Sequence, residues 1–343
     1  MNNTAYCFDP EHIYHLEGTH PEHPNRLTAV IERLRESGRL DRMREVPCVS
    51  APIDAIARVH DEQYPFLVES FCVRGGGHLD VDTYVTEASF RVARRALGGL
   101  LALVDRVVEG RSDNAFALIR PPGHHARPFS AMGFCLFGNV AAAAQHARAV
   151  LGLERVLVVD FDVHHGNGTQ EMLYEDPGVL VFSSHQHLAY PGTGELHETG
   201  AGAGGGYNAN APVPAGTDDQ GMLEIYRQVL APLADRYRPD LVLVSAGFDA
   251  HHMDPLADCE ISTTGFAEIM KVLLEIADRH CDGRLVAALE GGYHPGALAD
   301  SVEACLAVME NPSASIEDSH GPGRQRGADV EGLIADLKEI HRL

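Results

Sequence analysis

Short apolar runs recur along the chain, and each one gives way to polar residues. Five of these runs, rich in valine, leucine and alanine, are typical of strands that are buried on both faces of a parallel sheet. They lie at residues 115–119, 156–159, 179–184, 241–246 and 285–289.

Longer stretches with helical spacing of apolar residues separate these runs. They lie at residues 25–37, 87–108, 139–150, 222–237 and 265–280, with shorter helical pieces within 51–73. The alternation predicts an α/β fold with a central, mostly parallel β-sheet flanked by helices. We expect a single domain over residues 1–310, then a linker rich in Pro, Ser and Gly and a helix, together residues 311–343, that packs on or near the domain.

The composition is that of an ordinary globular protein, with 45% hydrophobic and 22% charged residues. The formal net charge is -22, because 49 acidic residues face only 27 basic ones. Such a chain should repel nucleic acids and anionic membranes and favour cationic partners. We therefore expect no nucleic-acid or membrane partner.

The seven cysteines are scattered and form no CxxC pair, which disfavours a disulfide framework or a structural zinc cluster. The first residues lack the basic and apolar regions of a secretory signal, and no later run is long enough for a membrane span. These features predict a cytoplasmic protein.

The most distinctive polar pattern lies within residues 154–170. An apolar strand runs into Asp160, Asp162 and His164, at two-residue spacing. Alternate residues of an extended chain face the same way, so Asp162 and His164 can present an oxygen and a nitrogen to one point. A solvated polar loop is the alternative, but acids and imidazoles packed against an apolar strand are costly unless a metal or hydrogen bonds offset their desolvation.

Polar residues also follow three other predicted strands. His124 and His125 come after the strand at 115–119, Asp249 after 241–246, and Tyr293 after 285–289. Ligands of open α/β sheets bind outside the carboxyl ends of the strands. We therefore expect all four segments to meet in one crevice.

Asp162, His164 and Asp249 would form a three-ligand set that leaves a coordination position open. A zinc ion in such a site lowers the pKa of a bound water towards ~7, and the same ligands also suit Fe²⁺. Nearby histidines can transfer protons, and the Tyr293 hydroxyl can donate to a developing oxyanion. Together these groups predict metal-assisted hydrolysis of an amide.

The tandem histidines should differ in basicity. Asp160 is placed to bond His124, and Asn167 is placed to bond His125. A carboxylate raises the pKa of a histidine more than a neutral amide does. His125 is therefore the better candidate for the general base.

Three further features carry weaker predictions. The histidines within residues 1–30 favour an irregular surface loop, and the glycine-rich run at 200–206 favours a flexible surface loop, since it lacks the spacing of a phosphate-binding loop. Asp82 lies in an acidic loop, where it holds a substrate backbone, is a solvated loop acid or caps a helix.

Several motifs together resemble those of the zinc-dependent histone deacetylase family, which has an arginase-like α/β fold. They are RPPGHHA at 120–126, GFC at 133–135, DFDVHHGNGTQ at 160–170, GFD at 247–249 with DPL at 254–256, and EGGY at 290–293. The resemblance covers roughly residues 5–310. Asn167, in place of the aspartate of class I members, and PEHPNR at 21–26 make the chain similar to class II and to bacterial histone-deacetylase-like amidohydrolases.

This resemblance implies a role for each matching residue. It implies one catalytic zinc on Asp162, His164 and Asp249, tandem catalytic histidines at His124 and His125, and a carbonyl-polarising hydroxyl at Tyr293. Phe134 and Tyr190 would flank a narrow tunnel for the acyl-lysine stem, with the Gly133 carbonyl beside it. A structural potassium ion is implied at the positions Asp160, Asp162, His164, Ser183 and Ser184.

The predicted activity is deacylation of an acylated lysine side chain, in a peptide or as a small acylated amine. An acetylpolyamine amidohydrolase is the nearest alternative, and Leu256 disfavours it because polyamine-specific relatives look acidic there. A binuclear manganese hydrolase is disfavoured because Asn167 is a poor ligand for a second metal. A protein that binds acylated lysine without hydrolysing it is the alternative of another class. The sequence leaves the oligomeric state open, a homo-oligomer included.

Overall fold

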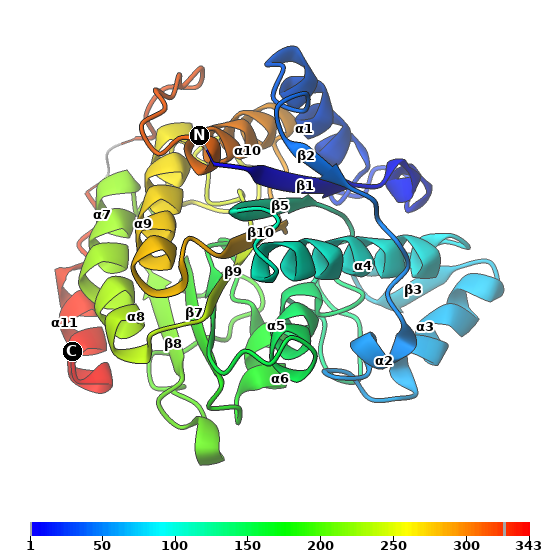
Figure 1. The fold of residues 1–343 in the computed structure, drawn as a ribbon, viewed down its shortest axis with the longest axis horizontal. Helices are drawn as coiled ribbons and strands as arrows, with labels where there is room; N and C mark the ends of the chain where they lie inside the picture. The colour runs from blue at the N-terminus through cyan, green and yellow to red at the C-terminus, as the bar shows by residue number, and fades with distance from the viewer. Residues whose placement is uncertain (1, 325–326) are drawn as a thin grey trace.

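The computed structural model describes residues 2–324 and 327–343 and is built around one eight-stranded sheet with helices on both faces (Figure 1). The strand order is β2-β1-β5-β10-β9-β6-β7-β8, and every neighbouring pair is parallel. The strands are β1 (Thr4–Phe8), β2 (Arg44–Val46), β5 (Asn114–Leu118), β6 (Val156–Asp160), β7 (Val179–Gln186), β8 (Asn208–Val213), β9 (Leu241–Ala246) and β10 (Leu285–Leu289). The predicted α/β fold is confirmed.

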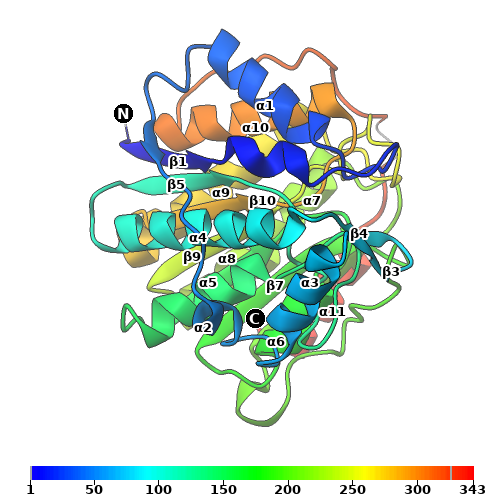
Figure 2. The same ribbon diagram turned by 90° about the vertical axis from the view of Figure 1, so that its right-hand side faces the viewer.

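Both faces of the sheet are covered because successive strand residues point in opposite directions. In β5, Phe116 and Leu118 belong to one apolar core, and Ala115 and Ala117 belong to the other. The first core lies under α1 (Asn25–Glu36), α7 (Asp219–Ile225), the π-helical turn η3 (Tyr226–Leu230), α8 (Ala231–Tyr237), α9 (Thr263–Cys281) and α10 (Pro295–Glu310). The second lies under α2 (Ile53–Ile56), α3 (Tyr64–Val73), α4 (Ser89–Val108) and α5 (Asn139–Ala149), which Figure 2 shows on the near side of the sheet.

The five strands expected from apolar runs are present, each within two residues of its predicted ends. Strands β1, β2 and β8 were not predicted. Strand β2 is short and partly exposed, and β8 reads NANAPV, so neither presents a continuous apolar run. The antiparallel hairpin of β3 (Gly77–Asp80) and β4 (Thr83–Val85) escaped for the same reason.

The prediction of a surface loop near the N-terminus is wrong for two of its histidines. His12, in the 3₁₀ helix η1 (Pro10–Tyr14), and His15, directly after it, are buried, 4% and 1% exposed. The Arg120 guanidinium donates to the main-chain carbonyls of both, and it forms an ion pair with the buried Glu22. The buried N–H donors of Arg120 need acceptors, and the N-terminal loop supplies them only by folding inward.

Two other segments pack against the body of the domain. The glycine-rich run contains a 3₁₀ turn, η2 (Gly202–Gly204), and Gly204 is buried so tightly that a Cβ there would lie 2.5 Å from the Tyr174 carbonyl oxygen, so the flexible-loop prediction is wrong at this point. The C-terminal helix α11 (Glu331–His341) buries Ile334 and Leu337 in the first core. No helix in the described ranges combines the length and apolarity needed to cross a bilayer.

Candidate active site

The predicted crevice forms at the carboxyl ends of four strands that are neighbours in the sheet, β5, β10, β9 and β6. The chain brings His124 and His125 there from β5, Tyr293 from β10, Asp249 from β9, and Asp162 and His164 from β6. The segment after β6 leads at once into the short helix α6 (Asn167–Leu173), so Asn167 stands at the start of a helix beside the crevice.

Asp162, His164 and Asp249 lie together and are spaced as metal ligands. The His164 Nδ1 atom lies 3.1 Å from Asp162 Oδ1 and 3.1 Å from Asp249 Oδ2. A single ring N–H cannot point well at both oxygens, whereas ligands at about 2.0–2.2 Å from a tetrahedral zinc ion are about 3.3 Å apart. The three side chains form a buried group able to hold a metal ion, and the set of two carboxylates and one imidazole fits zinc.

The backbone fixes the two ligand carboxylates. The Gly291 amide donates to Asp162 Oδ2 at 2.9 Å, and the Val163 amide donates to Asp249 Oδ1 at 2.9 Å. Two glycines make this approach feasible, because a Cβ on Gly247 would lie 1.9 Å from Asp162 Oδ2 and one on Gly291 would lie 2.1 Å from Asp249 Oδ2. The ligand group is therefore held in place before any metal binds.

The charges of the two carboxylates favour a proton on His164. Burial disfavours the charged imidazole, but the Asp249 and Asp162 carboxylates outweigh it and raise the pKa of His164 to about 11. Burial and the Asp162 charge raise the pKa of Asp249 as well. A divalent cation at this point must therefore displace at least the proton on His164.

Metal affinity should accordingly rise steeply with pH. His164 stays protonated up to a pKa of about 11 in the metal-free protein, so from about pH 6 to 8 each pH unit should tighten zinc binding about tenfold per proton released. Calorimetric zinc titrations of metal-free protein in buffers of different ionisation enthalpy measure that proton count. An affinity independent of pH would contradict the assignment, and His165→Asn, which lies outside the ligand group, serves as the control.

The tandem histidines make the two hydrogen bonds expected from the sequence. His124 Nδ1 donates to Asp160 Oδ2 at 3.0 Å, and His125 Nδ1 donates to Asn167 Oδ1 at 2.8 Å. Burial lowers the pKa of His124, but Asp162 and Asp160 outweigh it and raise the pKa to about 10. Burial and the positive charges of His124 and His164 hold the pKa of His125 well below its usual value. His125 is thus neutral, with a free lone pair on Nε2.

Tyr293 lies on a loop that is held from both sides. Arg26 donates to the Gly292 carbonyl at 2.6 Å, and its guanidinium lies over the Tyr293 ring, 4.7 Å from the centroid. On the other side, the Asp254 carboxylate accepts from the Tyr293 amide at 2.5 Å. Burial raises the pKa of the Tyr293 hydroxyl well above its usual value, and the Asp249 and Asp162 charges add to this, so the phenol stays protonated near the ligand carboxylates.

Arg26 and Asp254 are functional-site residues that the sequence-based reasoning did not single out. Each lies within a motif already noted, PEHPNR for Arg26 and DPL for Asp254. Their partners are backbone atoms of a distant loop, which no residue pattern reveals.

Aromatic rings gather at the rim of the site. The Tyr190 ring lies 5.1 Å from the His125 ring, and the Phe134 ring lies 5.8 Å from the Tyr293 ring. His20, a residue missed in the N-terminal segment, packs edge-on against Phe134 at 4.6 Å. Leu256 is 41% exposed and follows Asp254, whose carboxylate accepts from the Leu256 amide.

Asp82 belongs to the rim as well. Its carboxylate accepts from the Gly133 amide at 3.2 Å, next to Phe134. The helix-cap interpretation is wrong, because the residue before α4 is Ala88 and its side chain forms no capping bond.

The residues matched to a potassium site also lie close together. Asp160 of β6 is paired in register with Ser183 of β7. The Ser183 hydroxyl bonds to His185 Nδ1 at 3.0 Å, and the Ser184 hydroxyl bonds to the Tyr226 hydroxyl of η3 at 2.9 Å.

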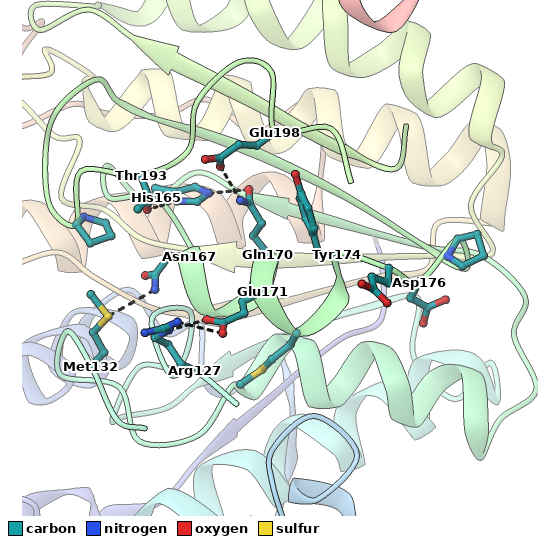
Figure 3. Close-up of a pocket in the computed structure, with 14 residues that line it drawn as sticks. Arg127, Met132, His165, Asn167, Gln170, Glu171, Tyr174, Asp176, Thr193 and Glu198 are labelled. Atoms are coloured by element: carbon teal, nitrogen blue, oxygen red, sulfur yellow. Dashed lines mark hydrogen bonds and ion pairs between the residues drawn. The ribbon is translucent and has the colours of Figure 1, made fainter. Parts of the chain in front are cut away.

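A cavity of about 910 Å³ is lined by His165 and Asn167, which follow two members of the ligand group in sequence, and by none of the three members of that group (Figure 3). Asn167 and Met132 form one side, where the Asn167 amide nitrogen donates to the Met132 sulfur at 3.5 Å. His165, Gln170 and Glu198 are linked by hydrogen bonds on another side. The contact with Met132 orients the Asn167 amide so that its oxygen faces His125.

Comparison with known proteins adds the following. A family model described as histone deacetylase domain matches residues 20–309. The chain is 39% identical to histone deacetylase 14, chloroplastic, of Arabidopsis thaliana, covering 96% of this chain and 82% of that protein. It is 39% identical to a probable deacetylase of Archaeoglobus fulgidus, covering 98% and 97%. The crystal structure of the HDA15 HD domain superposes with a TM-score of 0.91 at 34% identity, covering 99% of this chain and 95% of that one.

Proposed function

Because this chain belongs to the histone deacetylase family, we propose that it removes acyl groups from lysine side chains by metal-assisted hydrolysis. The family membership makes it a hydrolase acting on amide bonds. The observation that carries the finer proposal is the convergence of the metal-binding trio, a neutral His125 and a protonated Tyr293 at the end of one sheet.

Asp162, His164 and Asp249 would hold the ion, which when bound lowers the pKa of a water and polarises the acyl carbonyl. His125 accepts the water proton at Nε2, because Asn167 fixes its other nitrogen as the N–H donor. The oxygen of the water then bonds to the acyl carbon. The Tyr293 hydroxyl donates to the oxyanion that develops on the former carbonyl oxygen. His125 returns its proton to the amine nitrogen as the C–N bond breaks.

His124 has a supporting role in this scheme. With its pKa raised to about 10, it stays charged through the cycle and stabilises negative charge near the reacting carbon. Its charge also helps to keep the pKa of His125 low. Because the partner of His124 is the carboxylate of Asp160, His124 stays a cation. Because the partner of His125 is the neutral amide of Asn167, His125 can act as the base.

Replacing Asn167 by aspartate should move the pH dependence. A carboxylate bonded to His125 would raise the pKa of the base by about one unit or more, since it favours the imidazolium. The acid limb of the profile of kcat/KM against pH should shift to higher pH by that amount, while the rate at high pH is kept. Asn311→Asp, on the exposed surface after α10, should leave the profile in place. An unshifted limb in Asn167→Asp would show that His125 is not the base.

The substrate class is tested by direct competition. We propose acyl-lysine peptides, because the rim has exposed Leu256 where a carboxylate would favour a polyamine. An acetyl-lysine peptide should be turned over with a higher kcat/KM than acetylputrescine or acetylspermidine on zinc-loaded protein. A strong preference for either polyamine would replace the proposal by an acetylpolyamine amidohydrolase. Zinc-loaded protein that binds the peptide but cleaves none of the three amides would indicate a binding protein.

We propose zinc as the resident catalytic ion, with Fe²⁺ as the alternative that the same ligands accept. We also propose a structural potassium ion held by Asp160, Asp162, His164, Ser183 and Ser184. Its support is the register of Asp160 with Ser183 and the burial of all five residues. Exchange of potassium for a large excess of tetramethylammonium, which is too large for such a site, should lower the melting temperature.

A further inference from the structure

A second cavity lies at the opposite end of the sheet from the candidate active site. Its volume is about 470 Å³, and residues from four separate segments line it: Arg155, Pro177, Leu180, Gly205, Gly206, Tyr207, Leu233, Arg236 and Tyr237. Arg155 directly precedes β6, and Leu180 is the second residue of β7. The five residues of β6 span about 16 Å, so the two sites are well separated.

The charged residues that line this cavity are both arginines. No carboxylate lines it, although the chain as a whole carries a formal net charge of -22. Arg155 is partly engaged, since Nε donates to the Arg238 carbonyl at 2.8 Å and Nη2 lies 3.4 Å from Asp240 Oδ1. Arg236 donates from Nη1 to the His341 carbonyl of α11 and forms no ion pair with any carboxylate in the described part of the chain.

Tyr237 contributes its ring rather than its hydroxyl to the cavity. The residue is 8% exposed and lines the cavity. Its hydroxyl is closed off from solvent, so a ligand in the cavity would meet the face or edge of the ring.

The remaining walls are apolar. Leu180, Leu233 and Pro177 contribute aliphatic surface, and the Tyr207 ring packs against the Tyr237 ring with centroids 5.8 Å apart. The volume lies within the range of small-molecule sites and exceeds what an inorganic anion alone would fill. The cavity therefore combines a cationic, donor-rich part with a part suited to a flat or apolar group.

We propose that this cavity binds a small organic phosphate, a phosphate monoester joined to an aromatic or apolar group. The two guanidinium groups together match the charge of a phosphate dianion, and each offers a fork of N–H donors to its terminal oxygens. The apolar walls take the attached ring. The ion pair of Arg148 and Asp176 also lies near the Tyr237 hydroxyl, and its two charges offset each other.

Calorimetric titration of the full, zinc-loaded chain with AMP, inorganic phosphate and adenosine tests the proposal. AMP should bind, phosphate should bind more weakly, and adenosine should give no heat. Arg236→Gln and Arg155→Gln should each weaken AMP binding at least about tenfold, because each removes a charged donor to a charged acceptor. Arg111→Gln, an exposed arginine elsewhere on the surface, should bind AMP as the parent does.

Amide hydrolysis should be unchanged in all three variants, since none touches the candidate active site, and equal melting temperatures will show that they are folded. If one of the two cavity variants does not fold, the other decides. Absence of AMP binding to the parent would overturn the proposal. So would equal binding to parent, Arg236→Gln and Arg155→Gln, which would place the anion elsewhere, such as at the catalytic metal.

Discussion

A Tyr293→Phe variant should turn over acyl-lysine peptides roughly 100- to 1000-fold more slowly than the parent, which is the usual cost of removing one oxyanion donor. The change deletes only the hydroxyl. The Arg26 guanidinium still covers the ring and Asp254 still holds the backbone amide, so the loop should keep its place. The loss should fall on kcat rather than on KM, because the donor acts on charge that develops during the reaction.

Tyr190→Phe provides the matched control. Both tyrosines stand at the site, but the Tyr190 hydroxyl faces Asp82 at the rim, and this carboxylate together with burial raises its pKa. Removing that hydroxyl should change kcat at most a few-fold, as expected for a group that touches no developing charge. Metal content, measured by elemental analysis, should be unaltered in both variants. Near-parental kcat in metal-replete Tyr293→Phe would remove Tyr293 from the mechanism.

Asp249→Asn should cost the protein its metal and, with it, all measurable turnover. The amide keeps the shape of the side chain and an oxygen for the Val163 amide, but it brings no charge to the ligand group. Changes in groups that merely support a ligand commonly cost about 10- to 100-fold in metal affinity, so loss of a ligand should exceed about 100-fold. Zinc affinity measured by competition with a chelator reports this loss directly.

The effect of zinc on the melting temperature of the same variant also tests the metal site. Asp162 and Asp249 repel each other in the metal-free protein, and the Asp162 charge raises the pKa of Asp249. Asp249→Asn removes this repulsion and also the ion pair with the protonated His164, so the metal-free stabilities alone do not test the site. The parent should gain stability when zinc is added, and the variant should not. Asp235→Asn, an exposed acid on α8, should retain the response to zinc. If zinc does not change the melting temperature of the parent, the assignment of the metal site is contradicted.

The core of the fold and the centre of the site could be predicted because their signals are local. Buried parallel strands leave uninterrupted apolar runs, and the polar residues after each run mark its carboxyl end. That reasoning found His124, Asp162 and Asp249 without knowledge of their partners. It also gave the correct partners for the tandem histidines, since Asp160 and Asn167 are tied to the same turn as the ligands.

The sequence did not reveal the contacts of side chains that bond to backbone atoms of distant segments. Arg26 donates to the carbonyl of Gly292, and Arg120 donates to the carbonyls of His12 and His15. Both arginines lie in motifs noted from the sequence, but nothing in those motifs reveals these partners. The edge strands were not predicted for a different reason. Strand β2 at one edge and β8 at the other have polar or partly exposed residues, and neither resembles the central strands.

The two glycines that press against the ligand carboxylates limit how this protein can be redesigned. Even a methyl group at position 247 or 291 would collide with a carboxylate oxygen of the proposed ligand group, so the floor of the site offers no room for variation. Libraries that seek activity on longer acyl chains should therefore vary the ring of residues above, such as His20, Phe134 and Leu256. Substitutions at positions 247 and 291 would mostly give variants that no longer bind the proposed ion.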